Sequence, residues 1–291
     1  MVSRGDVKLR AKDSLCRRPH MSFRPIEEQR TMKRRHLLAA LPLLATGVFG
    51  ARSAKAAPAL KVGAALPDPP FEFMGKDGPA GFDIALMQRI AEKLGREWQL
   101  VPYQGADFNG IFAGLDSGTY DCIASGATIT PGRQRIADFC APYVVSGQSL
   151  VVDPSRHPTV HGIADLKGLV IGVQQGNTSQ PVANKLVAEH RAARVRVYAY
   201  DEIETALDDL STGGCDAFMK LAPVTEWFVR DRPKLAVVET GITRERLGIC
   251  VRKGNTALKD AVEKAQASLT ADGTLTALIK QWLGKGATVP G

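Results

Sequence analysis

Residues 60–103 read LKVGAALPDPPFEFMGKDGPAGFDIALMQRIAEKLGREWQLVPY, a stretch that combines two structural periodicities. Leu60–Leu66 and Trp98–Tyr103 are short apolar runs, which predict strands. Between them, Phe82–Leu94 places apolar residues at helical spacing, and Gly95 ends this helix. A strand, an amphipathic helix and a second strand in this order form a βαβ unit. The stretch therefore predicts an α/β protein with largely parallel strands.

The same alternation continues along the chain. Further strands are predicted at Tyr120–Ala124, Leu169–Val173, Val195–Tyr198, Cys215–Met219 and Leu235–Val238. Further helices are predicted at Phe108–Leu115, Ser179–Arg191, Ile203–Thr212, Val224–Arg230, Ala257–Thr270 and Thr274–Leu283. Two strand-like runs, Val144–Val152 and Leu247–Val251, bracket a central block of about ninety residues. We expect one domain inserted into another, with a first lobe of residues 57–145 plus 247–291 and a second lobe of 146–246.

The positive charge of the chain lies in its N-terminal part. Residues 1–56 hold 13 Lys and Arg against 4 Asp and Glu, although the whole chain has a formal net charge of only +8. The remainder holds 25 basic and 26 acidic residues, so it has no charge bias toward DNA or RNA. We expect no nucleic-acid partner.

Residues 1–56 are predicted to be a leader that contains a signal peptide. Lys33–Arg35 forms a basic region, Leu37–Phe49 is an apolar run too short to span a membrane, and Ala54–Ala56 has the small-x-small pattern of a cleavage site. A buried or interfacial helix is the alternative. We expect translation to start at Met32, whereas the arginine pair leaves Sec and twin-arginine export both open. The mature chain is then periplasmic.

The sequence has no pattern typical of a metal site, a phosphate loop or a nucleophile elbow. We therefore expect no cofactor, no metal and no catalytic residue. Cys122, Cys140, Cys215 and Cys250 are expected to be free thiols, with a Cys140–Cys250 disulfide as the alternative.

Several short motifs follow one another along the chain in a characteristic order. They are Pro69–Phe73 with Gly81–Ile84, Gly118–Asp121 with Thr128–Arg133, Asp138–Tyr143, Asp165–Gly168, Gly172–Thr178, Asp216–Ala217, Val251–Asn255 and Asp272–Thr274. In this order they resemble the periplasmic amino-acid-binding proteins of ABC importers, solute-binding protein family 3. The resemblance implies a two-lobed periplasmic-binding-protein fold whose lobes are joined by two crossover strands and close like a hinge. It also implies a monomer that captures an amino acid or related small carboxylate for an ABC permease in the inner membrane.

Arg133 is the leading candidate for the ligand anchor. A guanidinium presents a planar fork that matches a carboxylate, and the arginine at this place in the family motif holds the α-carboxylate of the ligand. The alternative is a solvated arginine beside Arg135.

Five small or polar residues are expected around this anchor. Ser125, Gly126 and Thr128 follow a strand end, where α/β proteins bind ligands and where backbone N–H groups can approach them. Asn177 and Thr178 begin a helix, whose free N–H groups favour an anion. In the family, the residue at the place of Thr178 contacts the carboxylate from the second lobe. Asn177 also suits a helix cap.

Phe108 is at the place of an aromatic that stacks on the ligand in the family, or else is a core residue.

The chain departs from the family pattern at two positions. Leu221 stands where the family has an aspartate for the α-ammonium, and Asp68 stands where it has a stacking tyrosine. We expect that Asp68, Glu72 or another acid binds the ammonium, or that the ligand lacks one. Lys220 either adds a second positive charge for an acidic ligand or points to water.

Two other functions stay open from sequence. Some periplasmic dehydratases acting on cyclic carboxylic acids resemble this family, and such an enzyme needs a general acid, for which Glu72 and Glu226 are available. An accessory or sensory protein binds ligand without serving a transporter.

The leader prediction is tested on protein from the native host. We expect the mature protein in the periplasm to begin at Ala57, because the basic region, the short apolar run and the cleavage pattern coincide. N-terminal sequencing measures this start. Cytoplasmic protein that keeps residues 32–56 contradicts it.

Overall fold

The computed structural model describes residues 57–290, and the predicted leader lies outside this range. The first βαβ unit is confirmed. β1 (Leu60–Ala65) and β4 (Trp98–Tyr103) pair in parallel, with α1 (Phe82–Lys93) between them in the chain. The apolar face of α1 is buried against the sheet, as its helical spacing predicts.

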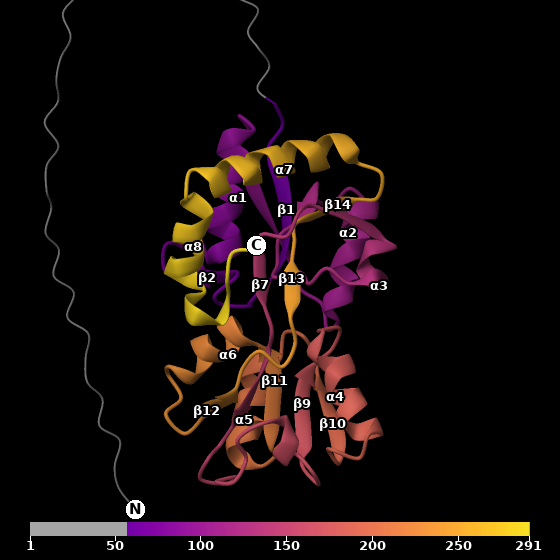
Figure 1. The fold of residues 1–291 in the computed structure, drawn as a ribbon. Coiled ribbons are helices and arrows are strands. Elements are labelled where there is room, and N and C mark those ends of the chain that lie inside the picture. The colour runs from indigo at the N-terminus through magenta and orange to yellow at the C-terminus, as the bar shows by residue number, and fades with distance from the viewer. Residues whose placement is uncertain (1–56, 291) are drawn as a thin grey trace, which may run out of the picture. The chain divides into compact units, whose positions relative to one another are not determined.

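Two five-stranded sheets form two α/β lobes (Figure 1). The sheet of the first lobe has the order β4-β1-β5-β14-β6, with β5 at Cys122–Ile123, β6 at Ala137–Phe139 and β14 at Cys250–Arg252. Its helices besides α1 are η1 (Phe108–Phe112), α2 (Ala113–Asp116), α3 (Pro131–Gln134), α7 (Thr256–Ala271) and α8 (Thr274–Trp282). The hairpin of β2 (Phe73–Gly75) and β3 (Gly78–Ala80) precedes α1.

The second lobe repeats this architecture. Its sheet has the order β10-β9-β11-β8-β12, and α4, α5 and α6 pack on it. The bounds are β8 Gln148–Val152, β9 Val170–Gln174, α4 Ser179–Ala188, β10 Arg194–Tyr198, α5 Ile203–Thr212, β11 Ala217–Leu221, α6 Ala222–Val229 and β12 Ala236–Glu239; the short η2 (Ile163–Asp165) precedes β9.

The sheets are mixed, which differs from the predominance of parallel strands that we expected. β8 pairs antiparallel with β11 and β12, and β14 pairs antiparallel with β5 and β6. Both β8 and β14 enter their sheets directly from a crossover. A strand that enters its sheet from the side facing the other lobe runs opposite to the strands that end on that side. Each crossover therefore adds an antiparallel strand.

An antiparallel ribbon of β7 (Val144–Ser146) and β13 (Glu245–Leu247) carries the chain between the lobes (Figure 1). The predicted run Val144–Val152 divides at Gly147, where a Cβ would lie 2.0 Å from the Thr243 carbonyl oxygen. The predicted lobe boundaries fall within the ribbon and stay a prediction. The C-terminal segment adjoins β7 through an isolated bridge between Val145 and Thr288. η3 (Gly284–Gly286) precedes that bridge.

Aromatic side chains join the lobes beside the ribbon. Phe71 is fully buried in the first lobe. The Phe73 ring lies 5.1 Å from that of Trp227 on α6 and 6.1 Å from that of Trp282 on α8. Tilted and edge-on contacts of this kind are favourable for aromatic rings. Phe73 thus links a helix of each lobe.

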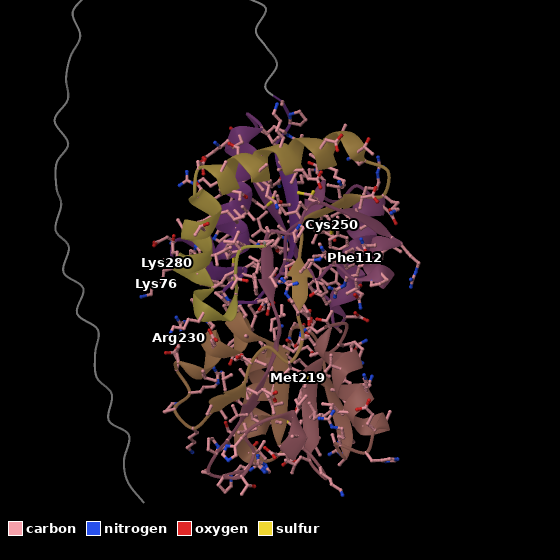
Figure 2. All side chains as sticks on the ribbon, viewed as in Figure 1. Lys76, Phe112, Met219, Arg230, Cys250 and Lys280 are labelled. Atoms are coloured by element: carbon pink, nitrogen blue, oxygen red, sulfur yellow. The ribbon has the colours of Figure 1, made fainter. Side chains whose placement is uncertain are left out.

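The four cysteines of the described chain are buried free thiols, as we expected. Burial raises the pKa of Cys140 to about 12 and that of Cys215 above its ordinary value. Cys250 is fully buried in the first lobe (Figure 2). Within residues 57–290, no helix is long and apolar enough to cross a membrane.

The thiols give a test of the fold. Because the reactive species is the thiolate, we expect all four to react slowly with a thiol reagent in the native mature protein and rapidly in urea. The absorbance of the chromophore that the reagent releases gives the number of thiols that have reacted. Two reactive thiols in urea without reductant would indicate a disulfide instead.

Candidate functional site

A small cavity lies between the lobes. All nine residues predicted from sequence line it: Asp68, Phe108, Ser125, Gly126, Thr128, Arg133, Asn177, Thr178 and Lys220. Four further residues complete the lining: Gln148, Ser179, Tyr200 and Leu221. The cavity therefore combines loops that follow β1 and β5 in the first lobe with β8, β11 and the start of α4 in the second.

Arg133 is buried, not solvated, and its guanidinium is held in place on three sides. Its Nε donates to Asn109 Oδ1 (3.2 Å), its Nη1 to the Thr128 carbonyl oxygen (3.1 Å) and its Nη2 to the Gly176 carbonyl oxygen (3.1 Å). A guanidinium has five N–H donors, so one remains on each Nη. Burial lowers the pKa of Arg133 to about 10, and the group stays charged at neutral pH. A fork of two N–H donors on a fixed cation is suited to a carboxylate.

Aromatic rings support the guanidinium. The Cζ atom of Arg133 lies 4.7 Å from the Phe108 ring centroid and 5.6 Å from that of Phe112. Phe108 itself packs against the Tyr200 ring, 5.2 Å away, and belongs to a buried apolar cluster. Phe108 is thus both a cavity-lining residue and a core residue, and its stacking on a ligand stays a prediction.

The lobes contact each other at Gly176. Its carbonyl oxygen accepts hydrogen bonds from Arg133 and from Asn109 Nδ2 (3.2 Å). Gly176 has φ +78°, and a Cβ there would lie 2.1 Å from Asp107 Oδ1 and 2.9 Å from the Phe108 nitrogen. Only glycine permits this backbone conformation and this approach without strain. The structure is therefore a closed form.

A buried ion pair spans the cleft. Lys220 Nζ, at the end of β11, lies 2.8 Å from Asp68 Oδ1 of the first lobe, and both side chains are less than a tenth exposed. Lys220 also donates to Gln174 Oε1 (2.6 Å) and lies 5.1 Å from the Tyr200 ring centroid. Lys220 thus points into the cleft and not to water. The ion pair uses Oδ1 of Asp68 and leaves Oδ2.

Glu245 is a buried residue of the site that the sequence did not single out. Its carboxylate accepts hydrogen bonds from Thr128 (2.6 Å) in the first lobe and Thr178 (2.7 Å) in the second. It also accepts from Gln148 Nε2 (2.8 Å) and Thr243 Oγ1 (2.8 Å). The hydroxyls of Thr128 and Thr178 therefore donate to Glu245 in this closed form. The opening motifs contain no signal for Glu245, because its role depends on the crossover that carries it.

Ser125 and Gly126 are held from behind the cavity wall. The Ser125 hydroxyl donates to Glu72 and accepts from the Ala65 nitrogen (3.0 Å). The Gly126 N–H donates to Asp83 Oδ2 (2.6 Å), so it is directed away from the cavity. Ser125 accordingly presents one remaining lone pair, an acceptor.

Apart from Asp68 Oδ1, which is paired with Lys220, three buried polar atoms of the lining have no hydrogen-bond partner within the described chain. They are Gln148 Oε1, Ser179 Oγ and Tyr200 OH. Both amide hydrogens of Gln148 are used, on Thr178 (3.1 Å) and on Glu245, so its Oε1 can only accept. Burying an unpaired polar group costs about 1–3 kcal/mol. A polar ligand that contacts these atoms removes this cost.

Neither carboxyl that the sequence offers as a general acid lines the cavity. Glu72 lies behind its wall, and Glu226 is outside the lining. Among residues 57–290, no group of three or more His, Cys, Asp or Glu side chains is arranged to hold a metal ion.

The family model for bacterial extracellular solute-binding proteins, family 3, matches residues 60–285. The chain belongs to this family. It is 34% identical over 223 residues to the L-cystine-binding protein TcyJ of Escherichia coli (strain K12), covering 76% of this chain and 80% of that protein. It is 32% identical to ABC transporter arginine-binding protein 1 of the same organism, covering 82% and 96%.

Solved structures agree with the two-lobed fold. An ancestral arginine-binding protein bound to arginine is 34% identical with a TM-score of 0.71, covering 78% of this chain and 98% of that one. The ancestral amino acid-binding protein AncCDT-1, a precursor of cyclohexadienyl dehydratase, is 30% identical with a TM-score of 0.69, covering 77% and 95%. The family match confirms the family predicted from the motifs, and the solved structures confirm the predicted fold.

Arg133 gives a test of the anchor. We expect Arg133→Ala to weaken amino-acid binding by at least about 2 kcal/mol, because truncation removes the buried charge that is predicted to pair with the ligand carboxylate. Calorimetry on folded protein measures this. Arg135→Ala, at the exposed neighbour, is the matched control and leaves affinity unchanged. Equal affinities of the two variants would remove Arg133 from the site.

Proposed function

We propose that this protein captures an α-amino acid in the cleft between its lobes and presents it to an ABC permease. The observation that carries this proposal is the polarity of the cavity. Arg133 lines the cavity and keeps one N–H donor on each Nη beyond its three hydrogen bonds. The start of α4, where Ser179 has an unpaired hydroxyl, adds a helix N-terminus that favours an anion. These groups suit the α-carboxylate.

The same lining supplies acceptors for an ammonium. Asp68 Oδ2, Gln148 Oε1 and the lone pair of Ser125 are acceptors on three elements. An α-ammonium has three N–H donors, so three acceptors can satisfy it. Asp68 thus takes the role that Leu221 cannot perform. This assignment favours a zwitterion over a carboxylate without an amine.

The charges of the lining restrict the ligand side chain. It contains two cations, Arg133 and Lys220, and one anion, Asp68. The ligand carboxylate balances Arg133, whereas Asp68 is already shared between Lys220 and the ammonium. A cationic side chain would meet no unshared anion of the lining and would be buried beside Lys220, which is unfavourable. We therefore propose a neutral polar or acidic side chain, although several relatives are named for arginine.

The family and the sequence together support the remaining parts of the proposal. We propose export through the signal peptide, action in the periplasm as a monomer, and no catalysis. The motif-matched Arg133 and the closing cleft support transport binding, and the position of Glu72 behind the wall supports this over a dehydratase-type enzyme. Permease and ATPase genes beside the coding gene would favour transport over a sensory role.

The side-chain proposal is tested by thermal shift and calorimetry with L-glutamine, L-cystine, L-glutamate and L-arginine. We expect at least one of the first three to bind more tightly than L-arginine. Lys220→Met removes a cation and releases Asp68, so it should shift the ratio of affinities toward L-arginine by at least about tenfold, or 1.4 kcal/mol. Lys167→Met, at an exposed lysine, is the control. Wild-type protein that prefers L-arginine contradicts this selectivity.

A further inference from the structure

Two buried carboxyl groups lie directly behind the cavity wall. Glu72 follows the Asp68 turn, and Asp83 begins α1; neither side chain is exposed to solvent. The Asp83 nitrogen donates to the Phe71 carbonyl oxygen (2.9 Å), which fixes the two acids next to each other. Both carboxyl groups are fully buried, and each affects the titration of the other. No part of the binding role described above uses this pair.

The other bonds of the two carboxyls point to the cavity wall. Glu72 Oε1 accepts from the Ser125 hydroxyl, and Asp83 Oδ2 accepts from the Gly126 N–H (2.6 Å) and the Tyr143 hydroxyl (3.1 Å). The second oxygens, Glu72 Oε2 and Asp83 Oδ1, are buried and receive no other donor from the described chain.

Two ionised carboxylates that are buried next to each other repel one another and lack the water that would stabilise their charges. A proton on either group removes one of the two buried charges. We propose that Glu72 and Asp83 share one proton at neutral pH and that this proton holds Ser125 and Gly126 in their positions at the wall. In this arrangement Ser125 offers the ligand only an acceptor, and the Gly126 N–H stays directed away. Glu72 and Asp83 are positioning residues, and their effect on ligand rests on the proposed function.

The surrounding charges favour the shared proton. Asp68 and Tyr143 face the pair, and Lys220, the nearest cation, is already paired with Asp68. Burial, with the charges of Asp83 and Asp68, raises the pKa of Glu72 well above its ordinary value. Burial also raises the pKa of Asp83 to about 7. Closely coupled carboxyls of this kind titrate as a pair.

The sign of the pH dependence follows from the raised pKa. The folded form holds a proton that the unfolded chain releases near pH 4. Stability from this proton is fully present below about pH 4 and is lost as the pH rises through about 7. Asp138, Asp153 and Asp272 have lowered pKa values, so their contributions change below this window.

Three ligand-free measurements test the proposal on the mature protein. Infrared spectra in heavy water should contain a protonated-carboxyl band at neutral pH that disappears as the pH rises. The NMR shift of the Gly126 amide proton should titrate with the same midpoint, because this N–H donates to Asp83. The urea midpoint of unfolding should fall between about pH 5 and about pH 8.

Glu72→Gln is the decisive variant. Its amide can accept from Ser125 and carries no titratable proton, so the infrared band and the Gly126 titration should both disappear. Asp83→Asn is the second variant and should also remove the band. Asp116→Asn, at an exposed acid, should change neither. A Glu72→Gln protein that keeps both the band and the Gly126 titration, or a wild-type protein without the band at neutral pH, overturns the proposal.

Discussion

The closed form depends on one buried carboxylate, that of Glu245. Four side chains donate to it: Thr128 of the first lobe, Thr178 of the second lobe, Gln148 at the start of β8 and Thr243 just before β13. Hydrogen bonds to a charged acceptor are stronger than neutral ones, and a buried charge without them is costly. Separation of the lobes withdraws Thr128 or Thr178 from this carboxylate. The ribbon residue thus connects the position of the lobes to the polar groups of the cavity.

The Asp68–Lys220 ion pair adds specificity to closure and little net stability. Removing two charges from water costs several kcal/mol per ion, and their attraction roughly offsets that cost. In an open form both groups regain water, so the pair does not prevent opening. When the lobes close, however, each charge requires the other, and this fixes their register. A pair of this kind suits a hinge protein, because it favours one closed geometry without making closure irreversible.

The sequence predicted the elements and the cavity lining well because both depend on local patterns. The periodicity of Phe82–Leu94 and the run Trp98–Tyr103 became α1 and β4. The motif around Arg133 predicted a residue that does line the cavity. Gln148, Tyr200 and Glu245 were missed, because their roles arise only when the crossovers bring distant segments together. Thr128 and Thr178 were expected beside the ligand, whereas in the closed form their hydroxyls donate to Glu245.

The coupling of ligand to closure follows from the unpaired atoms of the lining. Gln148 Oε1, Ser179 Oγ and Tyr200 OH are all buried without a partner in the described chain. Each of these groups that closure leaves without a partner opposes closure by about 1–3 kcal/mol. A ligand that bonds to them removes this penalty only in the closed form, so it binds that form more tightly. Differential affinity of several kcal/mol is enough to convert a mostly open population into a mostly closed one. The polar groups that select the ligand are therefore also the groups that make closure depend on it.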